Sequence, residues 1–266
     1  MSDWLLNLPV LWMTVVIVGS TYVFATALYV LVTALSTREM GNAFNAISPG
    51  MLPPLAVVFA LLIGFLAAQV WSDSDRANTA VNHEASALRE TVLLATAFPG
   101  ATESTIRDLV RRQIQEAVNL EWPAMARGQA TLTIVPGPLS EALHVVIALK
   151  PKDEGQAAAQ RELVDSLQAA FDARRQRIIL SRSSVNWVKW TALLVQAALT
   201  LITIALVHSH NRIANRIILA IFATGIGVSI VLIASHSRPF TGEISVSPSA
   251  LLQVMPEAGA AQSVVN

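Results

Sequence analysis

Four stretches of the chain are apolar and long enough to cross a bilayer. A membrane-spanning α-helix needs about 20 predominantly apolar residues. The four stretches cover residues 9–35, 52–71, 190–207 and 217–234. None contains Asp, Glu, Lys, Arg or His, and Trp71 and Trp190 stand at borders, where tryptophan is typical of the membrane–water interface. The pattern therefore predicts four transmembrane helices.

The segment between the second and third stretches is more polar and has the periodicity of helices. Val81, Ala85, Leu88, Val92 and Ala95 recur at alternating steps of four and three, which places them on one helix face. Further helices are expected over residues 102–120, 141–149 and from about 155 toward the third stretch, with a stop at residues 121–123. Residues 131–135 alternate weakly and predict a short strand.

These patterns predict an all-α polytopic membrane protein. Its helical domain is expected to be inserted between the second and third spans. The expected divisions are residues 1–71 for the first pair of spans, 72–186 for the helical domain, 187–236 for the second pair, and 237–266 for a tail that is disordered after about residue 256.

The distribution of basic residues predicts the orientation. Four crossings place both termini and residues 72–186 on one side, where eight Lys and Arg residues lie near the span ends, against three on the other side. Because cytoplasmic flanks carry the excess of Lys and Arg, the termini and the helical domain are expected in the cytoplasm, with the spans in the bacterial inner membrane. A cleaved signal peptide is disfavoured, since residues 1–7 carry no basic residue.

Composition excludes several classes of function. The chain is 53% hydrophobic and 14% charged, with 18 acidic and 18 basic residues, so it does not have the one-sided charge of a nucleic-acid-binding protein. It has no cysteine, which excludes disulfides and thiolate chemistry. The spans lack the ionisable groups of proton-coupled transporters, and no catalytic motif is present. We therefore expect no enzyme, catalytic residue, metal or cofactor.

Small residues recur four apart in two spans. Such spacing lets helix backbones approach closely. The helix-packing candidates are Ala56, Ala60 and Gly64 in the second span and Gly225 and Ser229 in the fourth. A narrow pore wall is the alternative use of the small residues in the second span.

Basic side chains gather before the third span. They are Arg174, Arg175, Arg177, Arg182 and Lys189, here called the basic collar. Such a collar can enrich anions at a pore mouth or bind anionic headgroups; the alternative is the ordinary excess of positive charge on the cytoplasmic side. Asp73 and Asp75 are expected to cap the helix that follows the second span. His208 and His210 lack further ligands and are expected to be interfacial rather than metal-binding.

Several segments together resemble bacterial proteins of the bestrophin-like family, over nearly the whole chain. They are SPGMLPP (residues 48–54), FLAAQVW (65–71), ANTAVNHEASALR (77–89), FPG (98–100), GQAAAQRE (155–162), DARRQRI (172–178) and RPFTGEISV (238–246). Bestrophins proper are pentameric anion channels with four spans per subunit, a helical cytosolic part and a pore lined chiefly by the second span.

The resemblance implies a homo-oligomeric channel for small anions in a lipid bilayer, with no nucleic-acid partner. The resemblance also implies that the second span lines the pore. The pore-lining candidates are Val58, Phe59, Leu62, Phe65 and Gln69. No calcium site is implied, because residues 236–246 offer only Glu243 as an acid. The alternative is a membrane-anchored scaffold that binds a partner through the seam of Val81, Leu88 and Val92.

Overall fold

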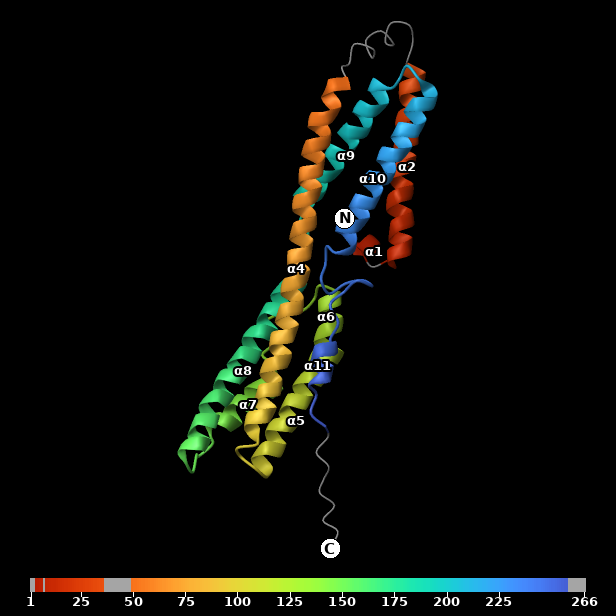
Figure 1. The fold of residues 1–266 in the computed structure, drawn as a ribbon. Helices are drawn as coiled ribbons and strands as arrows, with labels where there is room; N and C mark the ends of the chain where they lie inside the picture. The colour runs from red at the N-terminus through yellow and green to blue at the C-terminus, as the bar shows by residue number, and fades with distance from the viewer. Residues whose placement is uncertain (1–2, 7, 36–48, 258–266) are drawn as a thin grey trace. The chain divides into compact units, whose positions relative to one another are not determined.

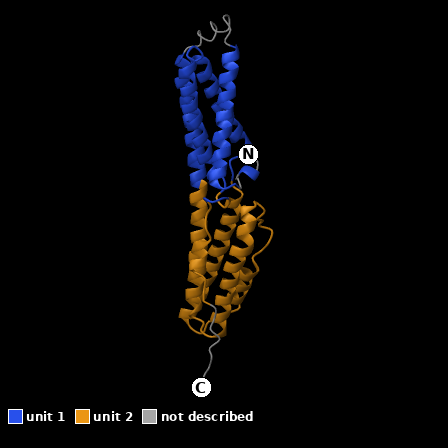
Figure 2. Cartoon of the chain, turned by 90° about the vertical axis from the view of Figure 1, so that its right-hand side faces the viewer, with its two compact units in different colours: residues 1–72, 184–238, 242–244 blue, residues 73–183, 239–241, 245–266 orange. Residues whose placement is uncertain are grey.

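The computed structural model describes residues 3–6, 8–35 and 49–257, and every regular element in them is a helix (Figure 1). The chain divides into two compact units, coloured in Figure 2. Unit 1 comprises residues 1–72, 184–238 and 242–244; unit 2 comprises residues 73–183, 239–241 and 245–266. The all-α prediction is confirmed for the described residues, and the strand expected over residues 131–135 is wrong. That segment is an irregular loop without a partner strand.

Unit 1 contains four apolar helices. They are α2 (Val10–Leu35), the first part of α4 (Leu52–Ala95), α9 (Trp187–Val207) and α10 (Arg212–Ser235). Each is long and apolar enough to cross a membrane, so among the described residues the four predicted stretches are indeed long apolar helices. Their shared core includes Met13, Ile17, Leu66, Val70, Trp190, Leu193, Ile226 and Ile230. The short helices α1 (Asp3–Leu6) and η1 (Pro49–Met51) complete the unit.

Asparagine caps explain why α9 and α10 begin before their apolar stretches. The side chain of Asn186 accepts a hydrogen bond from the Lys189 amide, and that of Asn211 accepts from the Ile213 and Ala214 amides. A capping side chain satisfies amides that have no partner inside the helix. The helices therefore start at their caps, three and five residues before the apolar runs.

Helices α2 and α10 approach closely at Gly227. A Cβ atom at this position would lie 3.2 Å from Val18 Cγ2 and 3.3 Å from Val18 Cα. At Gly225, which the small-residue pattern selected, a Cβ would meet nothing within 4 Å. The close approach therefore uses a glycine two residues away from the predicted one, on another face of α10.

Helix α4 continues well beyond its apolar part, without a break at Asp73 or Asp75. The expectation that these aspartates cap a new helix is therefore wrong. Pro53 and Pro54 lie in the first turn, where proline is tolerated, and no proline follows within the helix. Asp73 instead accepts a hydrogen bond from the Ser183 hydroxyl.

Unit 2 is also helical. It contains the second part of α4, α5 (Ala101–Glu116), a π-helical turn η2 (Ala117–Glu121), α6 (Trp122–Ala126), α7 (Gly137–Ile147), α8 (Glu154–Ser181) and α11 (Ser249–Gln253). The predicted helix stop at residues 121–123 is wrong. Pro123 occupies the first turn of α6, so it interrupts no hydrogen bond that the chain needs.

The apolar seam of α4 packs into the core of unit 2. Val81 and Leu88 are buried, and Val92 packs against the same core, whose other members include Ile106, Ile114, Leu163 and Leu167. The seam is thus used within the chain and is not open to a partner protein. This corrects the feature on which the scaffold alternative was based.

Part of the predicted tail is packed into unit 2. Phe240 lies edge-on to Trp122 with ring centroids 5.6 Å apart, and the Trp122 indole donates to the Val246 carbonyl. Leu251 on α11 is fully buried. The RPFTGEISV motif therefore supplies contacts to unit 2. The end of the chain that was expected to be disordered, residues 258–266, lies outside the described residues.

The contact at Gly227 yields a stability prediction. Gly227→Leu should destabilise the protein by about 1–3 kcal/mol, because its side chain must displace Val18. Gly225→Leu is the matched control, since its side chain enters open space and should leave stability nearly unchanged. Thermal unfolding of the detergent-solubilised protein, followed by circular dichroism, measures the difference. Equal losses in the two variants would contradict the proposed role of Gly227.

Candidate functional site

One face of the apolar part of α4 is not covered by any described helix of unit 1. Val58, Leu61 and Phe65 are 53, 56 and 73% exposed. Their spacing of three and four residues places them on one side of the helix, together with Val57 and Ala68. The opposite side carries Leu62, Ile63, Leu66 and Val70, which contact the core of unit 1. We call the exposed side the open face of α4.

The predicted pore-lining residues are divided between the two sides. Val58 and Phe65 belong to the open face. Phe59 and Leu62 pack against the core of unit 1, and the Gln69 side-chain oxygen accepts a hydrogen bond from the Lys189 ammonium. Sequence reasoning missed Leu61, although its spacing from Val58 and Phe65 places it on the same helix face.

The predicted helix-packing residues contact few neighbours within the chain. Ala60 is exposed, Ala56 is half-buried, and a Cβ at Gly64 would meet nothing within 4 Å. The Ser229 hydroxyl donates to the Gly225 carbonyl of its own helix. Packing of these small residues against another copy of the chain stays a prediction.

Two members of the predicted basic collar are buried in unit 2. Arg177 is fully buried on α8, where its Nε and one terminal amino group donate to the Glu84 carboxylate at 2.6 and 3.0 Å. The same amino group donates to Glu121 at 2.7 Å. Arg174, also buried, donates to Glu121 through Nε at 2.7 Å. These four residues form what we call the ion-pair cluster.

The burial of Arg174 and Arg177 corrects the expectation of a five-residue solvent-facing collar. A charge paired in the interior of unit 2 does not attract anions from solution. Arg175 is exposed, Arg182 is exposed and donates to the Ala130 carbonyl, and Lys189 is half-buried beside Gln69. The physical reason is that Glu84 and Glu121, which are distant in sequence, compensate the buried guanidinium groups.

Burial and charge act in opposite directions within the cluster. Burial raises the pKa of the Glu84 carboxyl, although the positive charge of Arg177 opposes this rise. Burial lowers the pKa of Arg177, but the carboxylates of Glu84 and Glu121 outweigh it and hold the Arg177 pKa above its ordinary value. The guanidinium therefore stays protonated. It also lies 4.8 Å from the centre of a Trp122 ring, a favourable cation–π position.

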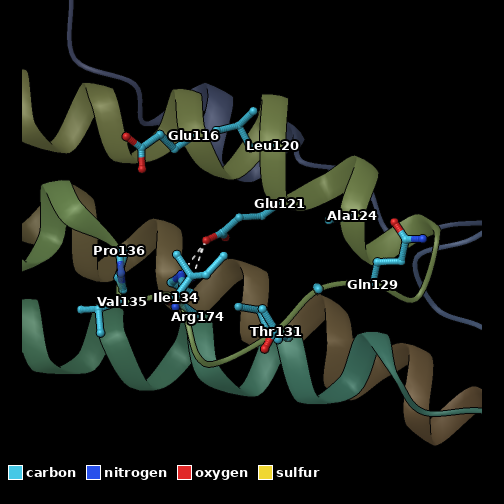
Figure 3. Close-up of a pocket in the computed structure, with 12 residues that line it drawn as sticks. Glu116, Leu120, Glu121, Ala124, Gln129, Thr131, Ile134, Val135, Pro136 and Arg174 are labelled. Carbon is cyan, nitrogen blue, oxygen red and sulfur yellow. Dashed lines mark hydrogen bonds and ion pairs between the residues drawn. The ribbon is translucent and has the colours of Figure 1, made fainter.

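A cavity of about 200 Å³ adjoins the cluster inside unit 2 (Figure 3). Glu121 and Arg174 form its charged wall, and the loop before α7 forms another. Its apolar lining includes Leu120, Ala124, Ile134, Val135 and Ile178. The sequence contained no signal for this cavity, because its walls come from residues 116–136 and from residues 174–178 on α8, about 40 positions further along the chain.

The described residues contain no group of three or more His, Cys, Asp or Glu side chains that could hold a metal ion. His208 contacts the Ile204 carbonyl of its own helix through Nδ1, and His210 is exposed.

Comparison with known proteins decides the family. The family model described as a bestrophin-like domain matches residues 9–251. The chain belongs to the bestrophin-like family. No curated protein matches the chain in sequence.

Two solved structures share the fold of this bestrophin-like chain. A crystal structure of a variant bacterial bestrophin homologue from Klebsiella pneumoniae is similar with a TM-score of 0.69 at 12% identity, covering 90% of this chain and 97% of that one. A variant of a membrane protein is similar with a TM-score of 0.67 at 12% identity, covering 90% and 95%. At this identity the likeness shows the fold alone.

The ion-pair cluster yields a second stability prediction. Arg177→Met should destabilise the protein by about 3–5 kcal/mol, because it leaves the buried Glu84 carboxylate without its partner. Replacing both residues, Glu84→Leu with Arg177→Met, should recover much of this loss. Thermal unfolding of each variant provides the measurement.

Arg112→Met is the matched control. It breaks solvent-exposed pairs with Asp108 and Glu141, which are expected to contribute about 0–1 kcal/mol. A loss at Arg177 no larger than that at Arg112 would contradict a structural role for the cluster.

Proposed function

We propose that the chain assembles into a homo-oligomeric channel that passes small anions through a bacterial inner membrane. Three facts support this proposal: membership of the bestrophin-like family, a fold shared with a bacterial bestrophin homologue, and spans without ionisable groups. Bestrophins are anion channels. In the proposed topology the termini and unit 2 lie in the cytoplasm.

The observation that carries the proposal is the open face of α4. A helix face that no helix of the same chain covers has to contact lipid, another copy, or a water-filled lumen. In a ring of copies, the open faces would surround the axis and line it with Val58, Leu61 and Phe65. Phe65 has the largest side chain on this face and would form the narrowest ring. Hydrophobic constrictions of this kind gate channels by excluding water.

Exposed basic groups support the choice of anions. Arg175 and Arg182 are exposed, and Lys189 lies at the start of α9 with no carboxylate partner among the described residues. Positive side chains near a conduction path raise the local concentration of anions. The ring of pore residues itself carries no charge, so these groups would supply the electrostatic preference.

The natural absence of cysteine permits a direct test of the open face. Val58→Cys, Leu61→Cys and Phe65→Cys should each react with a membrane-impermeant, negatively charged thiosulfonate reagent. Anion current through reconstituted protein in planar bilayers should then fall, because the added charge repels anions in the lumen. The same reagent should leave the unmodified protein unaffected.

Two further positions serve as controls. Leu66→Cys lies on the buried side of α4, and Val23→Cys is exposed on α2. Neither should change the current after treatment. If well-folded oligomers give no current under any salt gradient, the channel proposal fails. If current is present but treatment with the reagent does not reduce it in the three open-face variants, α4 does not line the pore.

A second candidate function rests on the apolar rim of the cavity in unit 2. Leu120, Ile134 and Val135 are each about two-thirds exposed, which is typical of a surface that binds a protein partner. In this case the chain is a membrane-anchored interaction protein. Ile134→Asp with Val135→Asp in the full-length protein should abolish a partner contact detected by crosslinking in cells while leaving ion flux intact. Unchanged crosslinks would remove support for this candidate.

A further inference from the structure

A groove runs between α2 and α10 within unit 1. A cavity of about 280 Å³ lies between Tyr22, Thr26 and Tyr29 of α2 and Arg216, Leu219 and Ala220 of α10. A second, more open hollow shares Tyr22, Thr26 and Val30; its described lining comes from α2 alone and reaches Ala34, near the end of that helix. From Tyr29 to Tyr22 the first cavity follows roughly 10 Å of helix. We call them together the α2–α10 groove.

Arg216 brings a positive charge to the groove, and no ion pair compensates this charge among the described residues. The guanidinium carbon of Arg216 lies 5.5 Å from the centre of the Tyr29 ring, and its Nε donates to the Arg212 carbonyl at 3.3 Å. No described residue occupies its terminal amino groups. Glu243 is the one carboxylate among the described side chains of unit 1, and it accepts from the Val10 amide. The Arg216 charge is therefore uncompensated by any described acid.

The remainder of the groove is mostly apolar. The hydroxyl groups of Tyr22 and Thr224 hydrogen-bond to each other at 2.6 Å, which leaves the Thr26 hydroxyl as a polar group in this part of the lining. The walls beyond it are formed by side chains such as Val30 and Leu219. A ligand that fits must therefore join an anionic group to an apolar chain of several carbons.

The location of the charge also fits the border of the bilayer. Arg216 lies in the second turn of α10, and Tyr29 lies in the last two turns of α2. Tyrosine is enriched at membrane–water interfaces, and arginine near a helix end extends its charged group toward them. An acyl chain that follows α2 from Tyr29 toward Tyr22 would then run into the hydrocarbon region.

We propose that the α2–α10 groove binds an anionic glycerophospholipid, with its phosphate held by Arg216 and one acyl chain against α2. A free inorganic anion would use only the charged end of the groove. A zwitterionic lipid would bring its own cation toward Arg216. The inference requires that the apolar helices span a membrane, and it does not depend on ion conduction.

Native mass spectrometry of the full-length protein in detergent tests the groove. Dioleoylphosphatidylglycerol should bind more tightly than dioleoylphosphatidylcholine. Arg216→Gln should weaken phosphatidylglycerol binding by roughly tenfold, the loss expected for a charge-assisted hydrogen bond, and weaken phosphatidylcholine binding less, because the choline cation already offsets the charge of its phosphate. Arg161→Gln on α8, an exposed arginine of unit 2, is the matched control and should change neither.

A second variant separates the apolar contact from the charge. Ala220→Leu should weaken binding of both lipids, because its side chain fills the cavity while Arg216 remains. Equal affinity of wild type for the two lipids, or phosphatidylglycerol binding that survives Arg216→Gln, would overturn the proposal. Displacement of the lipid by an equal concentration of soluble glycerol 1-phosphate would assign the groove to a free anion. If Arg216→Gln changes the oligomeric state of the protein but not its lipid binding, the α2–α10 groove binds a second copy of the chain instead.

Discussion

Backbone hydrogen bonding in a hydrocarbon environment is the constraint on which the structure of unit 1 depends. A bilayer offers no water to amides and carbonyls, so each span must satisfy them within its own helix. Most hydroxyl groups in the spans follow the same rule, whereas Gln196 donates to the Leu55 carbonyl of another helix. Hydroxyl groups donate to carbonyls of their own helix four residues earlier at Thr14, Thr21, Thr200, Thr203, Thr224 and Ser229. Where α2 meets α10, the close approach at Gly227 is joined by the hydrogen bond between the Tyr22 and Thr224 hydroxyl groups.

Unit 2 contains an ion-pair cluster in its interior. Arg177 on α8 pairs with Glu84 on α4 and with Glu121, the last residue of the π-helical turn. A π-helical turn shifts the side chains that follow it around the helix axis, and such turns are frequent at functional positions. Here the turn ends on the carboxylate that holds both Arg174 and Arg177. The cluster therefore ties α4, η2 and α8 together through groups that are costly to bury singly.

The two units suggest different tasks for the bestrophin-like chain. In unit 1 the open face of α4 is uncharged, and the α2–α10 groove joins Arg216, which has no ion-pair partner in the described part of the chain, to a mostly apolar wall. In unit 2 the strongest charges are neutralised by each other, which leaves Arg175 and Arg182 as exposed bases near the end of α8. Both α2 and α4 leave most of their apolar surface uncovered by the described chain, and the channel proposal assigns the open face of α4 to the pore.

The sequence by itself determined the helical class, the four apolar helices and the resemblance to the family, because length, apolarity and helical spacing are local properties. It did not determine which basic residues are exposed, since Glu84 and Arg177 are 93 positions apart and only packing brings them together. The tertiary structure also decided that Leu62 faces the core while Leu61 does not. It selected Gly227 over Gly225 as the contact glycine. A pattern of small or charged residues predicts which contacts a helix is able to make. Which of those contacts form depends on the helices that pack beside it in the folded chain.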